Sequence, residues 1–227
     1  MRVTEIGKRL LSAAEFVRQG AYFADIGTDH AYLPLFLLEK GTVEGAVCVD
    51  VNEGPLKSAE ANARERGLTE KITFILSDGA EKLSGMGVTD VAICGMGGEL
   101  IAGIIDRAPF LRDPNIRLIL QPMTKQSELR RFLARNGFSV IGESYSYDSG
   151  KYYVCLCAFY SGEFKELSPV EAEFGKINEA DEFSPAKLGY FEAKKHALQR
   201  AINGKRLGGE DVSYEEEILS EISKYVR

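Results

Sequence analysis

Residues 21–30 read AYFADIGTDH, an apolar run that ends at Asp25 and is followed by Gly27 and Asp29. A short continuous apolar run next to a turn signal is typical of a buried strand. A turn that binds a dinucleotide would read G-x-G-x-x-G, and the second of those glycine positions is Asp29 in this chain. Because the Asp29 carboxylate would repel a pyrophosphate, the pattern favours a cationic ligand that lies against the backbone of Gly27.

Further apolar runs follow this stretch at regular intervals, with helical patterns between them. We expect strands at residues 21–26, 45–51, 72–76, 90–94 and 117–120, and helices at residues 33–40, 55–66, 99–107 and 127–136. Before them, apolar residues at helical spacing between positions 3 and 17 predict an amphipathic helix. Continuous apolar strands that alternate with helices predict a parallel sheet covered on both faces.

The rhythm changes at residue 138, because two runs rich in aromatic and β-branched residues follow without room for a helix between them. They span residues 138–147 and 152–160 and are separated by Asp148-Ser149-Gly150-Lys151. Parallel neighbours need a crossover of about a dozen residues or more, so this pair must be antiparallel. A mostly parallel sheet with a terminal antiparallel hairpin predicts the Rossmann-like α/β fold of class I methyltransferases.

After residue 163 the strand patterns stop and the chain reads as helices at residues 168–178, 185–203 and 213–226. We therefore expect two domains, an α/β domain over residues 1–163 and a helical, coiled-coil-like domain over residues 164–227. Between Pro185 and Arg206 there is one acid, Glu192. The basic residues of this segment are Lys187, Lys194, Lys195, Arg200, Lys205 and Arg206. They are candidates for binding phosphates, and the alternative is a stabilising or dimerising appendage.

Composition narrows the class of protein. The chain has 227 residues and a formal net charge of −6, which argues against binding nucleic acid through overall charge. Its four cysteines lie in apolar runs and its two histidines are far apart, so we expect a reduced, cytoplasmic protein without a metal site. Nowhere do 18 apolar residues run together, and we expect neither a membrane span nor a targeting segment.

Acids also end the second and third expected strands. Asp50, followed by Val51, could bind the two hydroxyls of a ribose, although an Asp here could also cap the next helix. Asp78, followed by Gly79, could accept a hydrogen bond from an adenine amino group, although Asp-Gly is also a common turn. Acids at the ends of three neighbouring strands are more specific than any one of them and suit S-adenosylmethionine, which carries a sulfonium and an ammonium group but no phosphate.

Two further stretches follow the fourth and fifth expected strands. The first contains Gly95, Met96, Gly97 and Gly98, whose glycines suggest close approach of the backbone to a ligand, with a plain turn as the alternative. The second begins with Gln121 and Pro122, and the Gln121 amide could bond the edge of a base or cap the following helix.

Two aromatic residues next to the first turn also have two readings each. Tyr32 could stack on an extracted base or could belong to the core, and we favour the core. His30 could take part in the chemistry or be a buried histidine bonded to the backbone.

Together, DIGTDHAYLP at residues 25–34, GMGGELI at residues 95–101 and the Gln-Pro pair resemble the bacterial tRNA (adenine-22-N1)-methyltransferase family over essentially the whole chain. The resemblance implies S-adenosyl-L-methionine as methyl donor and N1 of an adenine in tRNA as acceptor. With Thr28 and Val51 added as neighbours, the cofactor-binding residues are then Asp25, Gly27, Thr28, Asp29, His30, Asp50, Val51, Asp78, Gly79, Gly95, Met96, Gly97 and Gly98. From the chemistry and charge of the residues we expect Asp29 and His30 to be catalytic, and Tyr32, Gln121, Pro122 and the six basic residues above to contact tRNA. Where the family pattern has Gln-Pro-Asn, this chain has Met123 in third place.

Two other function classes remain open on the sequence. An oxidoreductase that uses NAD is disfavoured by Asp29 and by the terminal hairpin. A non-catalytic protein that binds tRNA or the cofactor is compatible with the absence of an obligatory nucleophile, because adenine N1 already carries an in-plane lone pair and needs positioning more than activation.

Overall fold

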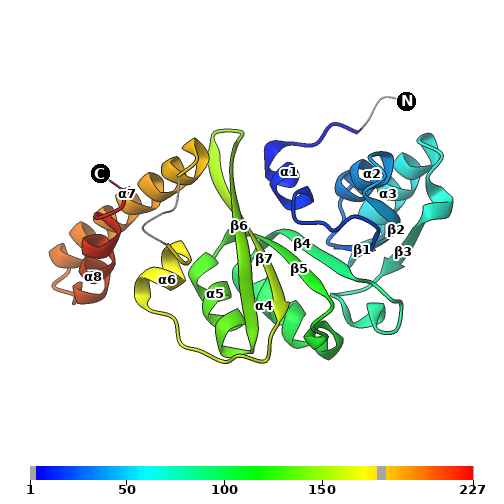
Figure 1. Cartoon of the computed structure of the whole chain (residues 1–227). Coiled ribbons are helices and arrows are strands. Elements are labelled where there is room, and N and C mark those ends of the chain that lie inside the picture. The colour runs from blue at the N-terminus through cyan, green and yellow to red at the C-terminus, as the bar shows by residue number, and fades with distance from the viewer. Residues whose placement is uncertain (1–3, 178–182, 227) are drawn as a thin grey trace.

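The computed structural model describes residues 4–177 and 183–226, and shows one seven-stranded sheet with helices on both faces and a helical extension at one end (Figure 1). The strands are β1 (Ala21–Ile26), β2 (Val43–Asp50), β3 (Ile72–Leu76), β4 (Asp90–Gly97), β5 (Arg117–Thr124), β6 (Phe138–Asp148) and β7 (Lys151–Tyr160). The helices are α1 (Lys8–Ala14), α2 (Tyr32–Glu39), α3 (Glu53–Glu65), α4 (Gly98–Asp106), α5 (Gln126–Arg135), α6 (Pro169–Phe174), α7 (Pro185–Leu207) and α8 (Ser213–Ile222).

The strand order is β3-β2-β1-β4-β5-β7-β6, which confirms the expected methyltransferase topology. Strands β1 to β5 pair in parallel, whereas β7 runs antiparallel to both β5 and β6. Ser149 and Gly150 form the hairpin turn and both have positive φ, as a two-residue turn that follows the sheet twist requires. The β1–β4 register pairs Asp25 with Ala92, so the ends of these central strands lie at the same edge of the sheet.

The core has two layers, one on each face of the sheet. Buried residues of α1, α2 and α3 pack on one face, and those of α4, α5 and the C-terminal helices pack on the other. The second layer is continuous across residue 163, because Leu118 and Phe138 belong to the same apolar cluster as Phe191 and Ile218. The division into domains at residue 163 stays a prediction. In the described residues, no helix combines the length and apolar character needed to cross a membrane.

Several element ends differ from the sequence prediction. Strands β4 and β5 continue through the stretches expected to be loops, because Met96 pairs with Pro122 and Gly97 with Thr124. Helix α1 is only seven residues long, and residue 3 of the expected helix lies outside the described residues. Helix α6 ends at Phe174, before Gly175 at φ +76°, and residue 178 of the expected helix is also outside the described part. Helix α7 extends to Leu207, beyond the expected end at residue 203.

Helices α7 and α8 form the expected antiparallel pair at the end of the molecule away from β3 (Figure 1). Lys205 pairs with Glu215 close to the connecting turn, and the Lys195 ammonium donates to the carbonyl of Val226 toward the other end. Ile202 of α7 and Ile218 of α8 are buried in this part of the structure.

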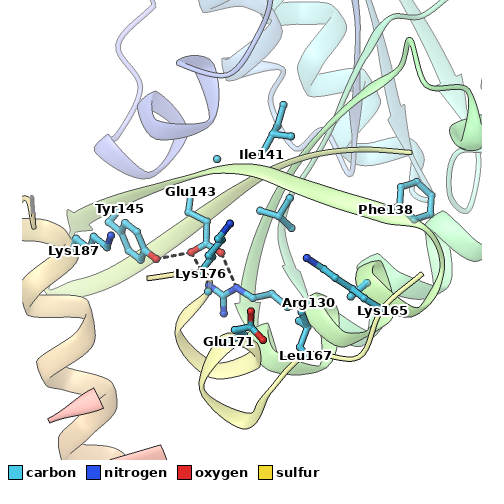
Figure 2. A pocket seen from close by; sticks show the side chains of 14 residues that line it. Arg130, Phe138, Ile141, Glu143, Tyr145, Lys165, Leu167, Glu171, Lys176 and Lys187 are labelled. Carbon is cyan, nitrogen blue, oxygen red and sulfur yellow. Dashed lines mark hydrogen bonds and ion pairs between the residues drawn. The ribbon is translucent and has the colours of Figure 1, made fainter. Parts of the chain in front are cut away.

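A buried ion pair fastens the helical extension to the sheet (Figure 2). The Arg130 guanidinium of α5 makes two hydrogen bonds to the Glu143 carboxylate of β6, at 2.8 and 3.0 Å. The same guanidinium donates to the carbonyls of Ala172 and Glu173 at 3.1 Å, and the Tyr145 hydroxyl donates to Glu143. Because every charge in the group has a partner, the network can remain buried.

We predict that Arg130→Ala lowers the free energy of unfolding by about 3–5 kcal/mol, because it leaves the Glu143 carboxylate without its counter-charge. The matched control is Arg135→Ala on the same helix, whose pair with Glu166 is exposed and should contribute less than about 1 kcal/mol. Urea unfolding of both variants measures the difference. Equal losses of stability would contradict the assignment of Arg130 as the fastening residue.

Candidate functional site

A cavity of about 360 Å³ opens where β1 and β4 end. The predicted site residues that line it are Asp25, Gly27, Asp29, His30, Tyr32 and Gly95. Arg9 and Leu10 from α1 and Cys94 from β4 complete the wall. The edge of a parallel α/β sheet at which the strands end is where such folds bind ligands.

The turn after β1 brings its backbone close to β4. Gly27 has φ +76°, and a Cβ at this position would overlap the Met96 side chain. Gly27 and Thr28 both donate their amide protons to the carbonyl of Val49, so the turn is held against β2. Thr28 is itself buried. A larger residue at position 27 would therefore strain the backbone at this φ and require the Met96 side chain to move.

Asp25 is the buried acid of the cavity, with a relative exposure of 8%. Burial raises the pKa of Asp25 to about 6, and the positive charge of Arg9 opposes that rise. Asp50, at the end of β2, is close enough to raise the Asp25 pKa further by repulsion. The cavity thus holds a carboxylate whose ionised form a cationic ligand would stabilise.

Arg9 was missed by the sequence reasoning, which treated its segment only as an amphipathic helix. Its guanidinium donates to the Gln121 side-chain oxygen at 2.6 Å, and the Gly95 amide donates to the same oxygen at 3.2 Å. Gln121 is fully buried at the end of β5. The one available signal was a basic residue within a partly apolar helix, which does not distinguish a cavity residue from a solvated one.

For Gln121 and Pro122 the structure differs from the sequence prediction. Both are buried, and the Gln121 amide bonds Arg9 and Gly95 rather than facing open space. Helix α5 begins at Gln126 without a side-chain cap, so Gln121 does not cap it either. In this structure Gln121 positions Arg9 instead of offering its amide to a substrate.

Asp29, His30 and Tyr32 form the exposed rim of the cavity. The Asp29 side chain is 78% exposed, and its carboxylate lies 3.5 Å from Nε2 of His30. The His30 and Tyr32 rings are 5.2 Å apart, and Tyr32 is 43% exposed. The core reading of Tyr32 and the buried reading of His30 were therefore wrong. Ala31 between them has φ +55°, and this left-handed residue turns the chain into α2.

The other predicted cofactor residues lie at the same edge of the sheet but outside the lining of this cavity. Asp50 accepts a hydrogen bond from the amide of Asn52 at 2.8 Å, and Val51 is exposed. Asp78 is exposed beyond β3, within 3.7 Å of the Arg107 guanidinium. Gly79 has φ +106°, so the Asp-Gly turn also has the conformational role considered above.

The glycines after β4 have a structural reason that the sequence did not show. Met96 and Gly97 belong to the strand, and a Cβ on Gly98 would overlap the Lys125 carbonyl. Gly98 is therefore required because the turn into α4 packs directly on the turn into α5. This corrects the expectation that the whole glycine stretch is a loop against a ligand, and only Gly95 among its glycines lines the cavity.

The basic residues of the helical extension are largely engaged within the protein. Lys194 pairs with Glu173, Lys205 with Glu215 and Arg206 with Glu216. Lys187 lies 4.5 Å from the centroid of the Phe183 ring. Arg200 is exposed and makes no ion pair or side-chain hydrogen bond with any residue that the structure describes. The sequence could not separate these cases, because each partner lies on another element.

Comparison with known proteins assigns the fold and the family. A family model described as a methyltransferase domain matches residues 6–156, which contain the whole cavity. A Streptococcus pneumoniae protein whose structure was solved with S-adenosyl-L-methionine is 34% identical, with a TM-score of 0.81 over 95% of this chain and 100% of that one. The curated tRNA (adenine(22)-N(1))-methyltransferase of Bacillus subtilis is 34% identical over 158 residues, or 70% of this chain.

The chain belongs to the tRNA (adenine-22-N1)-methyltransferase family. The sequence alignment with the curated B. subtilis member spans 66% of that relative's own length. The M. capricolum member, solved with S-adenosyl-homocysteine, is 27% identical and covers 97% of each chain with a TM-score of 0.78. The likeness to methyltransferases of this family therefore includes the helical extension as well as the sheet.

We predict that Asp25→Asn changes how the stability of this methyltransferase depends on pH. Because the folded-state pKa of Asp25 lies above its ordinary value of 3.8, the unfolded chain loses this proton first, and stability is lost as the pH rises from about 4 to about 6. Asn does not ionise, so the variant should be more stable than the parent by about 1–3 kcal/mol above pH 7 and about equally stable below pH 4.

Urea unfolding of the parent and both variants between pH 4 and 7.5 provides the measurement, with exposed Asp29→Asn as the control that should show no such difference. A constant stability difference between Asp25→Asn and the parent at every pH would contradict the raised pKa.

Proposed function

We propose that this protein transfers the methyl group of S-adenosyl-L-methionine to N1 of an adenine in tRNA, at position 22. The observation that carries the proposal is the cavity at the strand ends, whose wall contains both the buried Asp25 carboxylate and the Arg9 guanidinium. The fold around it is shared with methyltransferases of that activity. Action on tRNA would place the protein in the cytoplasm.

The charges of the cavity fit the methyl donor. Its amino-acid part carries a carboxylate that Arg9 can bind and an ammonium group that Asp25 can bind, and its sulfonium adds a second positive charge near these acids. A neutral, fully apolar cavity would support neither contact. We assign the ribose hydroxyls to Asp50 with Val51, and the adenine edge to Asp78 with Gly79, because these acids follow β2 and β3 in turn along the sheet edge.

When bound, the cofactor supplies a methyl group on a positively charged sulfur. The N1 lone pair of the acceptor adenine forms the new C–N bond while the electrons of the C–S bond return to sulfur, so positioning supplies most of the acceleration and no strong base is needed. Methylation leaves the adenine ring cationic. We assign to Asp29, whose carboxylate is exposed at the rim, the stabilisation of that charge or removal of the N6 proton.

We propose further that His30 and Tyr32 receive the acceptor base. Their rings lie next to one another at the rim, and both line the cavity. Enzymes that modify a base take it out of its stack and hold it against aromatic side chains. His30 lies within 3.5 Å of the Asp29 carboxylate, so we assign it the orientation of that group as well as contact with the base.

Transfer of a labelled methyl group to tRNA, followed by nucleoside analysis, tests the function. We expect 1-methyladenosine, and we expect a transcript with guanosine at position 22 to remain unlabelled. Binding of labelled cofactor without transfer to any tRNA would instead support the non-catalytic alternative. Transfer to another nucleoside would keep the enzyme class and overturn the assigned acceptor.

Two substitutions separate the roles of the site acids. Asp50→Ala should weaken cofactor binding by about 1–3 kcal/mol, because it removes a charged hydrogen-bond acceptor. Asp29→Asn should lower kcat at saturating tRNA and cofactor. Calorimetry and single-turnover methylation measure the two effects. Unchanged affinity in the first variant, or full turnover in the second, would refute the corresponding assignment.

We also propose that the helical extension contacts tRNA phosphates, chiefly through Arg200. Lys187, Lys194, Lys195, Lys205 and Arg206 all have partners within the protein and would have to exchange them for a phosphate. Arg200 is exposed and would need no such exchange with a described residue. Its guanidinium can bond two phosphate oxygens at once.

Arg200→Gln should therefore make the slope of log affinity for tRNA against log salt shallower by roughly 0.7–0.9, the value of one phosphate contact. Lys57→Gln on α3 removes the same charge at the other end of the molecule and should leave the slope unchanged. Equal slopes for the Arg200 variant and the parent would return the extension to the role of a stabilising appendage.

A further inference from the structure

A second cavity of about 480 Å³ lies on the other side of α1 from the proposed cofactor cavity. Helix α1 supplies Lys8, Leu11 and Ser12, and Glu15 follows at its C-terminal end. Strand β6 supplies residues 144–147, and Tyr152 of β7 and the start of α7 complete the wall. In Figure 1 the tip of the β6–β7 hairpin stands between α1 and α7. The volume is in the range of sites that hold small organic groups.

The wall of this cavity contains an exposed aromatic pair. The rings of Tyr147 and Tyr152 are 4.7 Å apart, and Tyr147 is 47% exposed. Tyr152 is fixed by α7, because a Cβ on Gly189 would overlap its phenol ring. Tyr152 is 37% exposed, so both rings are open to the outside and one of them also contacts α7, which suits a stacking surface.

A buried hydroxyl of the same wall lacks a partner. Ser146 is 6% exposed, and its Oγ makes no hydrogen bond to any residue in the described ranges 4–177 and 183–226. The Ser146 oxygen has almost no accessible surface, so a ligand in the cavity does not reach it, and along β6 its side chain points to the face opposite that of Tyr147. Glu15 of the same wall accepts a hydrogen bond from the Ser144 hydroxyl through Oε2.

Helix α1 is the partition between the two cavities. Lys8 and Leu11 face the second cavity, whereas Arg9 and Leu10 line the cofactor cavity. The Arg9 amide also donates to the Asp148 carboxylate at the hairpin tip, at 3.2 Å. Because a helix with its side chains is about 10–12 Å across, the two cavities are close enough for neighbouring nucleotides of one strand.

We propose that this second cavity binds a nucleobase of the tRNA that flanks the reacting adenine, with Tyr147 as the stacking surface and the exposed Glu15 carboxylate as a hydrogen-bond acceptor. The inference rests on the proposed function and adds to it the place where the strand next to the target base is held. RNA is read mainly through unstacked bases that lie on aromatic side chains and bond through their edges.

The chemistry of the wall favours a base over a phosphate. Glu15 would repel a phosphate, whereas its carboxylate can accept a hydrogen bond from an exocyclic amine or a ring N–H of a base. Lys8 is exposed at the rim, where it could meet the strand's backbone without entering the cavity. The exposed edge of β6 could also pair with a peptide strand, but such pairing would not use the Tyr147 ring.

The test compares Tyr147→Ala with the conservative variant Tyr147→Phe in the full-length protein, with an unmodified tRNA transcript as the probe. Loss of one stacked base should raise both the Kd and the KM for tRNA about tenfold in Tyr147→Ala, while Tyr147→Phe stays within about twofold of the parent. The Kd for S-adenosyl-L-methionine, kcat at saturating tRNA and the salt slope of binding should remain unchanged, because no charge and no reacting group is removed.

Phe164→Ala is the control, because it removes an exposed ring elsewhere. It should alter neither the affinity for tRNA nor that for S-adenosyl-L-methionine.

Unchanged tRNA affinity in Tyr147→Ala, in a protein whose parent form methylates tRNA, would overturn this inference and leave the proposed function standing. Failure of the parent protein to methylate tRNA would overturn the proposed function itself. If a peptide strand displaced the transcript while Tyr147→Ala left the tRNA affinity unchanged, the cavity would be assigned to protein binding. That result would also overturn the inference.

Discussion

The parallel pairing of β1 with β2 and β4 is the constraint on which the site depends. Parallel strands end at one edge of the sheet, so Asp25, Asp50 and Cys94 come together although many residues separate them in sequence. Each strand leaves that edge through a turn into a helix, and the turns must pack closely on each other. Gly98 against the Lys125 carbonyl is the clearest instance, because a side chain there would separate the turns into α4 and α5.

Charge balance at this edge comes from outside the sheet. Arg9 on the short helix α1 reaches the cavity and is held by Gln121, whose oxygen also accepts from Gly95. The positive charge of Arg9 holds the pKa of buried Asp25 below the value that burial alone would give. Buried Asp25 next to Arg9 suits a zwitterionic ligand, which offers each of them an opposite charge. Either charge buried without a partner would cost free energy.

The helical extension is part of the same physical unit as the sheet. Arg130 links β6 to the carbonyls of α6, and apolar residues on both sides of residue 163 share one cluster. The acids Glu173, Glu215 and Glu216 neutralise three of the six basic residues of α7. Stable attachment of the extension thus reduces the charge it can offer to a polyanion, which leaves Arg200 as the exception among the described residues.

The sequence alone determined the sheet, its terminal hairpin and the acids of the first three strand ends, because hydrophobic periodicity and turn residues act over short distances along the chain. It also identified Asp29 as unsuited to a dinucleotide. Only the tertiary structure decided which of those acids share a cavity, that Tyr32 is exposed, and that Gln121 serves Arg9. These outcomes depend on contacts between elements more than 100 residues apart, such as α1 with β5, and no local pattern encodes which side chain such a contact will bury.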